Sequence, residues 1–221
     1  MFQTIAILAL LVTLVGIIIH WFASPAALKS RPAAGGGDRG IVRLFSLLLI
    51  EQRSSLLGVL KMLCYLVAMV CFVVLAFTGF WPVLVQGRHI TGWPMMIHAT
   101  LAPVFAICLA ILAVTWAGGN RFEKSDCPWL WRFLRRVTKL SIPKEDQEGP
   151  RNGELALKKL MFWAIIVLSL PLILSIILSM LPLFGTPMQE CLLGLHRWTA
   201  VVFAVAVLIH TYLAVRARMA G

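Results

Sequence analysis

The sequence predicts an all-α membrane protein, a bundle of five transmembrane helices. Hydrophobic residues make up 60% of the 221-residue chain, only 13% are charged, and the mean hydropathy of +0.90 is far above that of a soluble domain. Five apolar runs are long enough to cross a bilayer. They cover about residues 5–23, 59–83, 93–117, 160–183 and 192–215.

The first run starts at the N-terminus, where a signal peptide would also stand. It has no basic segment before it and its apolar core is too long, so we expect a membrane span. The glycine-rich stretch 31–40 is typical of a flexible linker, and the apolar but charge-interrupted 41–56 is expected to lie in the membrane interface. The chain therefore divides into an N-terminal transmembrane helix (1–24), a linker and interfacial segment (25–58) and a domain of four membrane spans (59–221).

The basic residues predict how the chain crosses the membrane. The connections 24–58 and 118–159, together with the C-terminal end, carry 17 of the 20 Lys and Arg residues. Because cytoplasmic loops are enriched in Lys and Arg, this side is expected to be the cytoplasm. The N-terminus is then periplasmic, the C-terminus is cytoplasmic, and 118–159 is a cytoplasmic loop of a protein in the bacterial inner membrane.

Two histidines share the last apolar run, His196 and His210, 14 residues apart. On an α-helix this spacing brings both imidazoles to within about 40° of one direction, with a rise of about 21 Å. Ionisable groups at two membrane depths are functional candidates. The spacing favours two stacked b-type haems, each with one axial ligand from this helix; the alternative is a pair of histidines hydrogen-bonded to neighbouring helices.

Other histidines are expected to complete the two sites. His98 lies near the start of the third span, which enters the membrane from the same side as the span that carries His196. The two imidazoles are therefore expected at matching depth, which suits bis-imidazole ligation of an outer haem. At the inner depth the second span offers only Tyr65, so His20 at the inner end of the first span is the candidate partner of His210. The alternatives are a five-coordinate haem, a pair with Tyr65, or a quinone site without haem. Arg197 is a candidate partner of the haem propionates, or an anchor at headgroup level.

Composition excludes several other classes. The formal net charge of +11 is spread over loops, and no stretch is long, polar and basic enough for a nucleic-acid-binding domain. The five cysteines form neither CxxC nor CxxCH, so any haem is held without thioether bonds and a disulfide framework is not expected. Glu154, Lys158, Lys159 and Tyr212 are candidates for proton delivery or quinone contact, although a solvated basic helix start is the favoured interpretation of these residues.

Several segments carry a resemblance to a known family. The second span closes with AFTGFWP (76–82), the third contains MMIHATLAPVFAI (95–107), and DCPWL (126–130) and LMFWAII (160–166) follow. The last span reads LLGLHRWTAVVFAVAVLIHTYLAVRA (192–217). From residue 59 to the end, the chain resembles the γ subunit (cytochrome b) of membrane-bound formate dehydrogenases, among the di-haem b cytochromes that anchor periplasmic oxidoreductases.

The resemblance implies a function as well as a fold. His98 and His196 would hold the haem near the periplasm, and His210 the haem near the cytoplasm, beside a menaquinone or ubiquinone site. Electrons would come from an iron–sulfur subunit and a catalytic subunit, or from a multihaem cytochrome. The chain departs from the family in two respects: Tyr65, after Cys64, stands where the family has its other inner ligand, and the N-terminal helix is additional. His20 on that helix is therefore expected to replace the ligand.

The sequence is compatible with more than one function. The leading interpretation is a non-catalytic electron-transfer subunit that links a partner oxidoreductase to the quinone pool. The alternatives are a membrane anchor with one haem or none, and a transporter that uses its histidines as a proton relay. Transporters usually show internal repeats or broken helices around a midplane site, and neither pattern is visible here.

Overall fold

A computed structural model describes residues 1–23, 56–123, 126, 150–181 and 183–220. Throughout these residues the regular structure is helical, which confirms the predicted all-α class. The long helices are α1 (Phe2–Ala23), α3 (Leu56–Phe80), α4 (Trp93–Trp116), α6 (Pro150–Met180) and α7 (Thr186–Ala220). All five are long and apolar enough to cross a membrane, as predicted.

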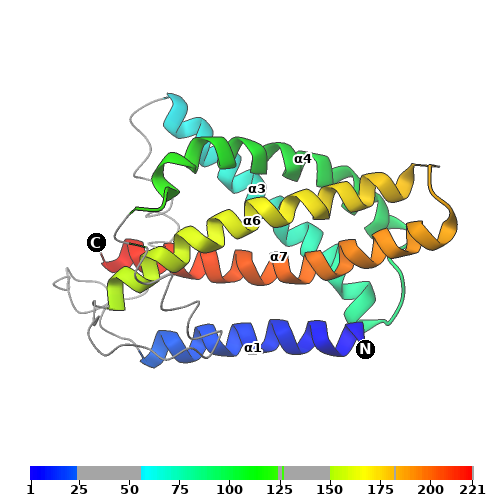
Figure 1. Cartoon of the computed structure of the whole chain (residues 1–221), viewed down its shortest axis with the longest axis horizontal. Helices are drawn as coiled ribbons and strands as arrows, with labels where there is room; N and C mark the ends of the chain where they lie inside the picture. Colours follow the sequence, from blue (N-terminus) through cyan, green and yellow to red (C-terminus); the bar gives the residue numbers. More distant parts are fainter. Residues whose placement is uncertain (24–55, 124–125, 127–149, 182, 221) are drawn as a thin grey trace.

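The four C-terminal helices form two antiparallel hairpins. α6 packs along the length of α7, α3 packs on α4, and contact between the hairpins is sparse. Figure 1 shows α1 on the side of α7 that faces away from α6, with α3 passing obliquely behind α6 and α7. We call the end where α7 begins the His196 end and the opposite end, where α6 begins, the His210 end.

A short turn joins α3 to α4 at the His196 end. α3 passes into a π-helical turn, η2 (Trp81–Val85), with Pro82 in its first turn. Gly92 then precedes α4 with φ of 63°, a conformation that glycine adopts without steric cost. Pro94 follows in the first turn of α4, where a missing N–H is tolerated. The turn therefore fixes where α4 enters the bundle.

Helix boundaries differ from the sequence expectation at α6. This helix begins at Pro150, ten residues before the apolar run at 160, so the loop expected to extend to 159 ends at 149. Proline is favoured at the first helical position, and the polar residues of the first turns find partners on neighbouring elements (below). The linker and interfacial segment was expected at 25–58. Its residues 25–55 lie outside the part of the chain that the structure describes, and α3 begins at Leu56.

The N-terminal helix contacts the bundle mainly through α7. At the His196 end, the Gln3 Nε2 atom donates a hydrogen bond to the carbonyl oxygen of Leu84 at 2.6 Å. The ring of Phe2 packs edge-on against Trp198, with centroids 4.8 Å apart. Most α1 side chains are exposed, and many of these are large hydrophobics, as expected of a lipid-facing helix.

Candidate functional site

His196 and His210 occupy equivalent positions in the α6–α7 pair. His196 Nδ1 lies 2.9 Å from the carbonyl oxygen of Leu172, and His210 Nδ1 lies 3.1 Å from that of Lys158. The two carbonyls are 14 residues apart on α6, just as the two histidines are on α7. The antiparallel register therefore repeats one contact at both ends, and both rings are held by the backbone of α6.

These contacts fix the tautomer of the two rings in their neutral form. A carbonyl oxygen can only accept a hydrogen bond, so the proton of each neutral imidazole must be on Nδ1. The lone pair of Nε2 is then directed away from α6. A histidine held in this way, with Nδ1–H on a carbonyl, is the usual arrangement of an imidazole that binds a metal through Nε2.

His98 on α4 is also held through its Nδ1 atom. Its Nδ1 lies 3.0 Å from the Thr78 hydroxyl, which donates its own proton to the Val74 carbonyl at 2.8 Å. The Thr78 oxygen therefore accepts from Nδ1–H, and Nε2 is again left for a ligand. A Cβ atom at Gly79 would lie 3.1 Å from Cε1 of His98, so glycine makes room for this ring. His98 also lies within electrostatic range of His196, so the structure brings the predicted outer pair together.

An apolar cavity of about 90 Å³ lies between the hairpins near the His210 end. All four helices line it, and His210 and Thr211 are on its α7 wall. Phe72, Phe105 and Phe203 bound it toward the middle of the bundle, with ring centroids 6.0–6.3 Å apart. Because Phe203 is seven residues from each histidine of α7, these three rings separate the His196 end from the His210 end.

A comparison with protein families identifies the family of the chain. The profile described as prokaryotic cytochrome b561 matches residues 61–221. The chain belongs to this family. The match covers the four helices from α3 to α7 and leaves α1 outside it. A search of curated proteins finds no match. With its five apolar helices, this b561-family chain is a multi-pass bacterial membrane protein, a b-type cytochrome of electron transfer.

The residues of the site suit the b-type haem that the cytochrome b561 family implies. Three imidazoles have Nε2 free of the hydrogen bonds that hold their rings, and two of them lie together at the His196 end. Axial ligation needs one or two such groups, so it is compatible with the absence, among the described residues, of any cluster of three or more metal-binding side chains. A porphyrin is larger than the cavity beside His210, and the flexible side chains on its walls would have to turn aside.

His20 lies in a different environment. Its Nδ1 is 2.6 Å from the Tyr212 hydroxyl and 3.2 Å from a guanidinium nitrogen of Arg216, and both of those groups donate. The proton is therefore on Nε2, which points toward a Glu154 carboxylate oxygen 4.0 Å away. Tyr212 is two residues after His210, so its side chain leaves α7 about 200° around the helix from that of His210. The structure does not bring His20 to the cavity beside His210, and the expected pairing of these two histidines stays a prediction.

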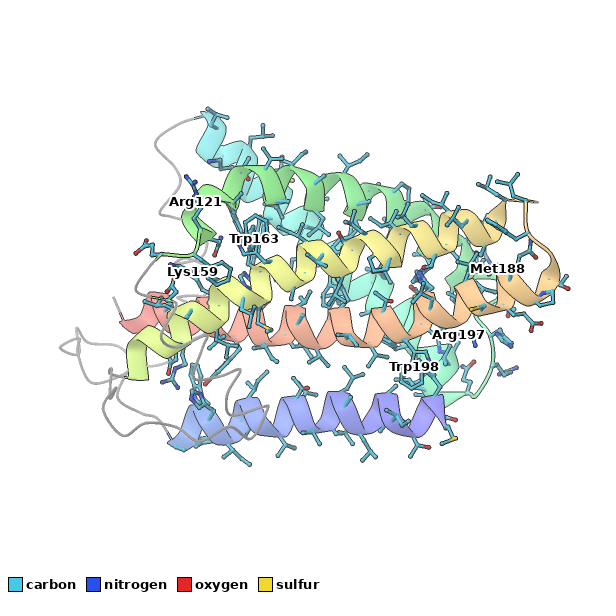
Figure 2. All side chains as sticks on the ribbon, viewed as in Figure 1. Arg121, Lys159, Trp163, Met188, Arg197 and Trp198 are labelled. Carbon is cyan, nitrogen blue, oxygen red and sulfur yellow. The ribbon has the colours of Figure 1, made fainter. Side chains whose placement is uncertain are left out.

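Arg197 lies at the His196 end of α7, beside Trp198 (Figure 2). Its guanidinium donates to Nδ1 of His89 at 2.6 Å, so His89 too has its proton on Nε2. The guanidinium is thus placed at the end of the bundle where the predicted outer site lies. Its role toward a propionate stays a prediction.

The polar candidates at the start of α6 are paired with neighbouring elements. Glu154 accepts from the buried Arg216 at 2.9 Å, and the Lys159 ammonium lies 2.7 Å from the Asp126 carboxylate. Trp163 also donates to the Asn120 carbonyl at 2.9 Å. Figure 2 shows Lys159 and Trp163 near the end of the bundle opposite Arg197. These contacts tie the end of α4 to α6 next to Lys158, whose carbonyl holds His210.

We expect Asp126→Asn to destabilise this end of the protein by about 1.5–3 kcal/mol, the range for a hydrogen bond to a charged group. Burial alone would raise the pKa of Asp126, but the Glu123 backbone N–H and the Lys159 ammonium outweigh it and lower that pKa. The stabilisation is therefore full above the unfolded pKa of about 3.9 and is lost as the pH falls through the lower folded value. Thermal unfolding in detergent at several pH values measures this.

The matched control for that experiment is Glu123→Gln, whose side chain is exposed and lies 4.0 Å from Lys159. It should change the unfolding temperature little, because exposed ion pairs contribute about 0–1 kcal/mol. Equal effects of Asp126→Asn and Glu123→Gln at neutral pH would show that the buried contact adds no more stability than the exposed ion pair.

Proposed function

We propose that the chain is the membrane-anchor subunit of a redox complex and transfers electrons between a partner oxidoreductase and the quinone pool. The proposal includes two haem b sites along α7. Its main support is the repeated contact of His196 and His210 with backbone carbonyls of α6, which leaves both Nε2 atoms free for a ligand. Histidines kept only for packing would not need the same tautomer at two levels of one helix.

In this proposal the residues have separate tasks. His98 and His196 would hold one haem from opposite hairpins, and His210 would hold the other. Thr78 and the two α6 carbonyls orient the imidazoles. Each haem, when bound, would supply an iron that takes up and releases one electron. The apolar walls around His210 would exclude water from that site.

The direction of insertion and the partner are also proposals. The positive-inside rule puts the His196 end at the periplasm and the His210 end at the cytoplasm. An iron–sulfur subunit of a formate-dehydrogenase-like enzyme would then dock near His196, and menaquinone or ubiquinone would bind near His210. The support for this partner is the resemblance of the last span, with its two histidines, to formate dehydrogenase γ subunits.

A reduced-minus-oxidised visible spectrum of the purified full-length chain tests the central claim. We expect a b-type α-band and a haem content of two per chain. Absence of the band in protein purified from haem-sufficient cells would overturn the proposal, and a content of one would remove one of the two sites. Purification in mild detergent, followed by identification of co-purified subunits, tests the partner.

A further inference from the structure

The cavity beside His210 has a second wall that carries a possible metal ligand. On α3, Tyr65 and Met69 line this cavity opposite His210. Among the described residues that line it, the other side chains with a nitrogen, oxygen or sulfur atom are Trp116 and Thr211. The Trp116 indole nitrogen only donates, and Thr211 is next to His210 on the same helix, so neither can bind an iron from the opposite side.

The register of the helices places Tyr65 and Met69 near the level of His210. Gly79 on α3 lies against His98, which is within electrostatic range of His196, so these residues mark one level of the bundle. α3 runs opposite to α7 (Figure 1). Counting 14 residues back along α3 from Gly79 and 14 forward along α7 from His196 gives Tyr65 and His210. Met69 is one turn closer to the middle, on the same face of α3.

The direction of the side chains brings Met69 and His210 closer together along the length of the bundle. Side chains of an α-helix lean toward its N-terminus. α3 begins at the His210 end, so the Met69 thioether leans toward that end. α7 begins at the His196 end, so the His210 ring leans toward the middle of the bundle. The two groups thus approach a common level from opposite walls.

The chemistry of the two α3 candidates favours methionine. A thioether is neutral, suits an apolar cavity and forms low-spin His/Met haem with a raised potential. A phenol would have to lose its proton to bind well, which an apolar cavity disfavours, and the Tyr65 ring packs on Trp116 with centroids 5.4 Å apart. We infer that Met69 is the second axial ligand of the haem held by His210. This inference rests on the proposed function.

Met69→Leu in the full-length chain is the test, with Met62→Leu as the matched control on the same helix outside the cavity lining. The oxidised wild-type protein should show two low-spin EPR signals and a near-infrared sulfur-to-iron charge-transfer band. Met69→Leu should lose that band and convert one low-spin signal to high spin, whereas Met62→Leu should match the wild type. Met69→His should restore a low-spin signal without the sulfur band, which loss of packing alone would not produce.

Two further outcomes separate the inference from the proposed function. An unchanged sulfur band in Met69→Leu, or its absence from a wild-type protein with two low-spin haems, overturns the Met69 assignment and leaves the electron-transfer function standing. Loss of one low-spin signal in His20→Ala or Tyr65→Phe, with Met69→Leu unchanged, assigns the ligand to that residue instead. A wild-type protein without haem overturns both.

Discussion

Replacing either His98 or His196 with alanine is expected to remove one and the same haem and to lower the haem content from two per chain to one. The two imidazoles come from opposite hairpins, each has its proton on Nδ1, and each therefore leaves Nε2 unprotonated for a ligand. Loss of an axial ligand should weaken binding by more than the ~10–100-fold typical of changes to the groups that orient ligands. Haem quantitation and low-temperature EPR of each variant measure this.

His89→Ala is the matched control, because His89 lies at the same end and accepts a hydrogen bond from Arg197 through Nδ1. It should keep both haems. Thr78→Val should have an intermediate effect, since it keeps the size of the side chain and removes only the acceptor for His98. Full haem content and an unchanged spectrum in both His98→Ala and His196→Ala would mean that the assigned pair is wrong.

The sequence predicted the five spans because apolar length depends only on composition along the chain. It also placed His196 and His210 on one face, since helical periodicity is a local property. It did not predict that α6 begins at Pro150, because the polar residues after Pro150 look like loop residues until their partners are known. Glu154 and Lys159 pair with Arg216 and Asp126, which are distant in sequence.

The tautomers of the histidines were also outside the reach of the sequence. They depend on backbone carbonyls of Leu172 and Lys158, and a carbonyl is common to every residue, so no residue type marks these acceptors. Gly79 and Thr78 were visible in the quoted AFTGFWP segment, but their contact with His98 requires the register of α3 on α4. The assignment of His20 depends on its depth and on the added helix that carries it, and neither tells which side of α7 a residue occupies.

His210→Ala is expected to remove the haem at the other end and to abolish electron transfer from that end to a quinone. His210 is the one imidazole on the walls of the cavity near the end of α7, as far as the described residues show, so no second histidine there could replace it. The outer haem should remain, because the rings of Phe72, Phe105 and Phe203 separate the two ends and the hydrogen bonds of His98 and His196 are independent of His210. Haem content, EPR and quinone reduction by the assembled complex measure the three consequences.

Lys158→Ala is the informative control for this prediction. His210 donates to the backbone carbonyl of Lys158, and that carbonyl persists when the side chain is shortened. The variant should therefore keep both haems and the spectrum of the wild type. If it instead lost the same haem as His210→Ala, the lysine side chain rather than the backbone carbonyl would support the site. If His210→Ala kept two haems, His210 would not be an axial ligand, and the 14-residue repeat along α7 would have a purely structural origin.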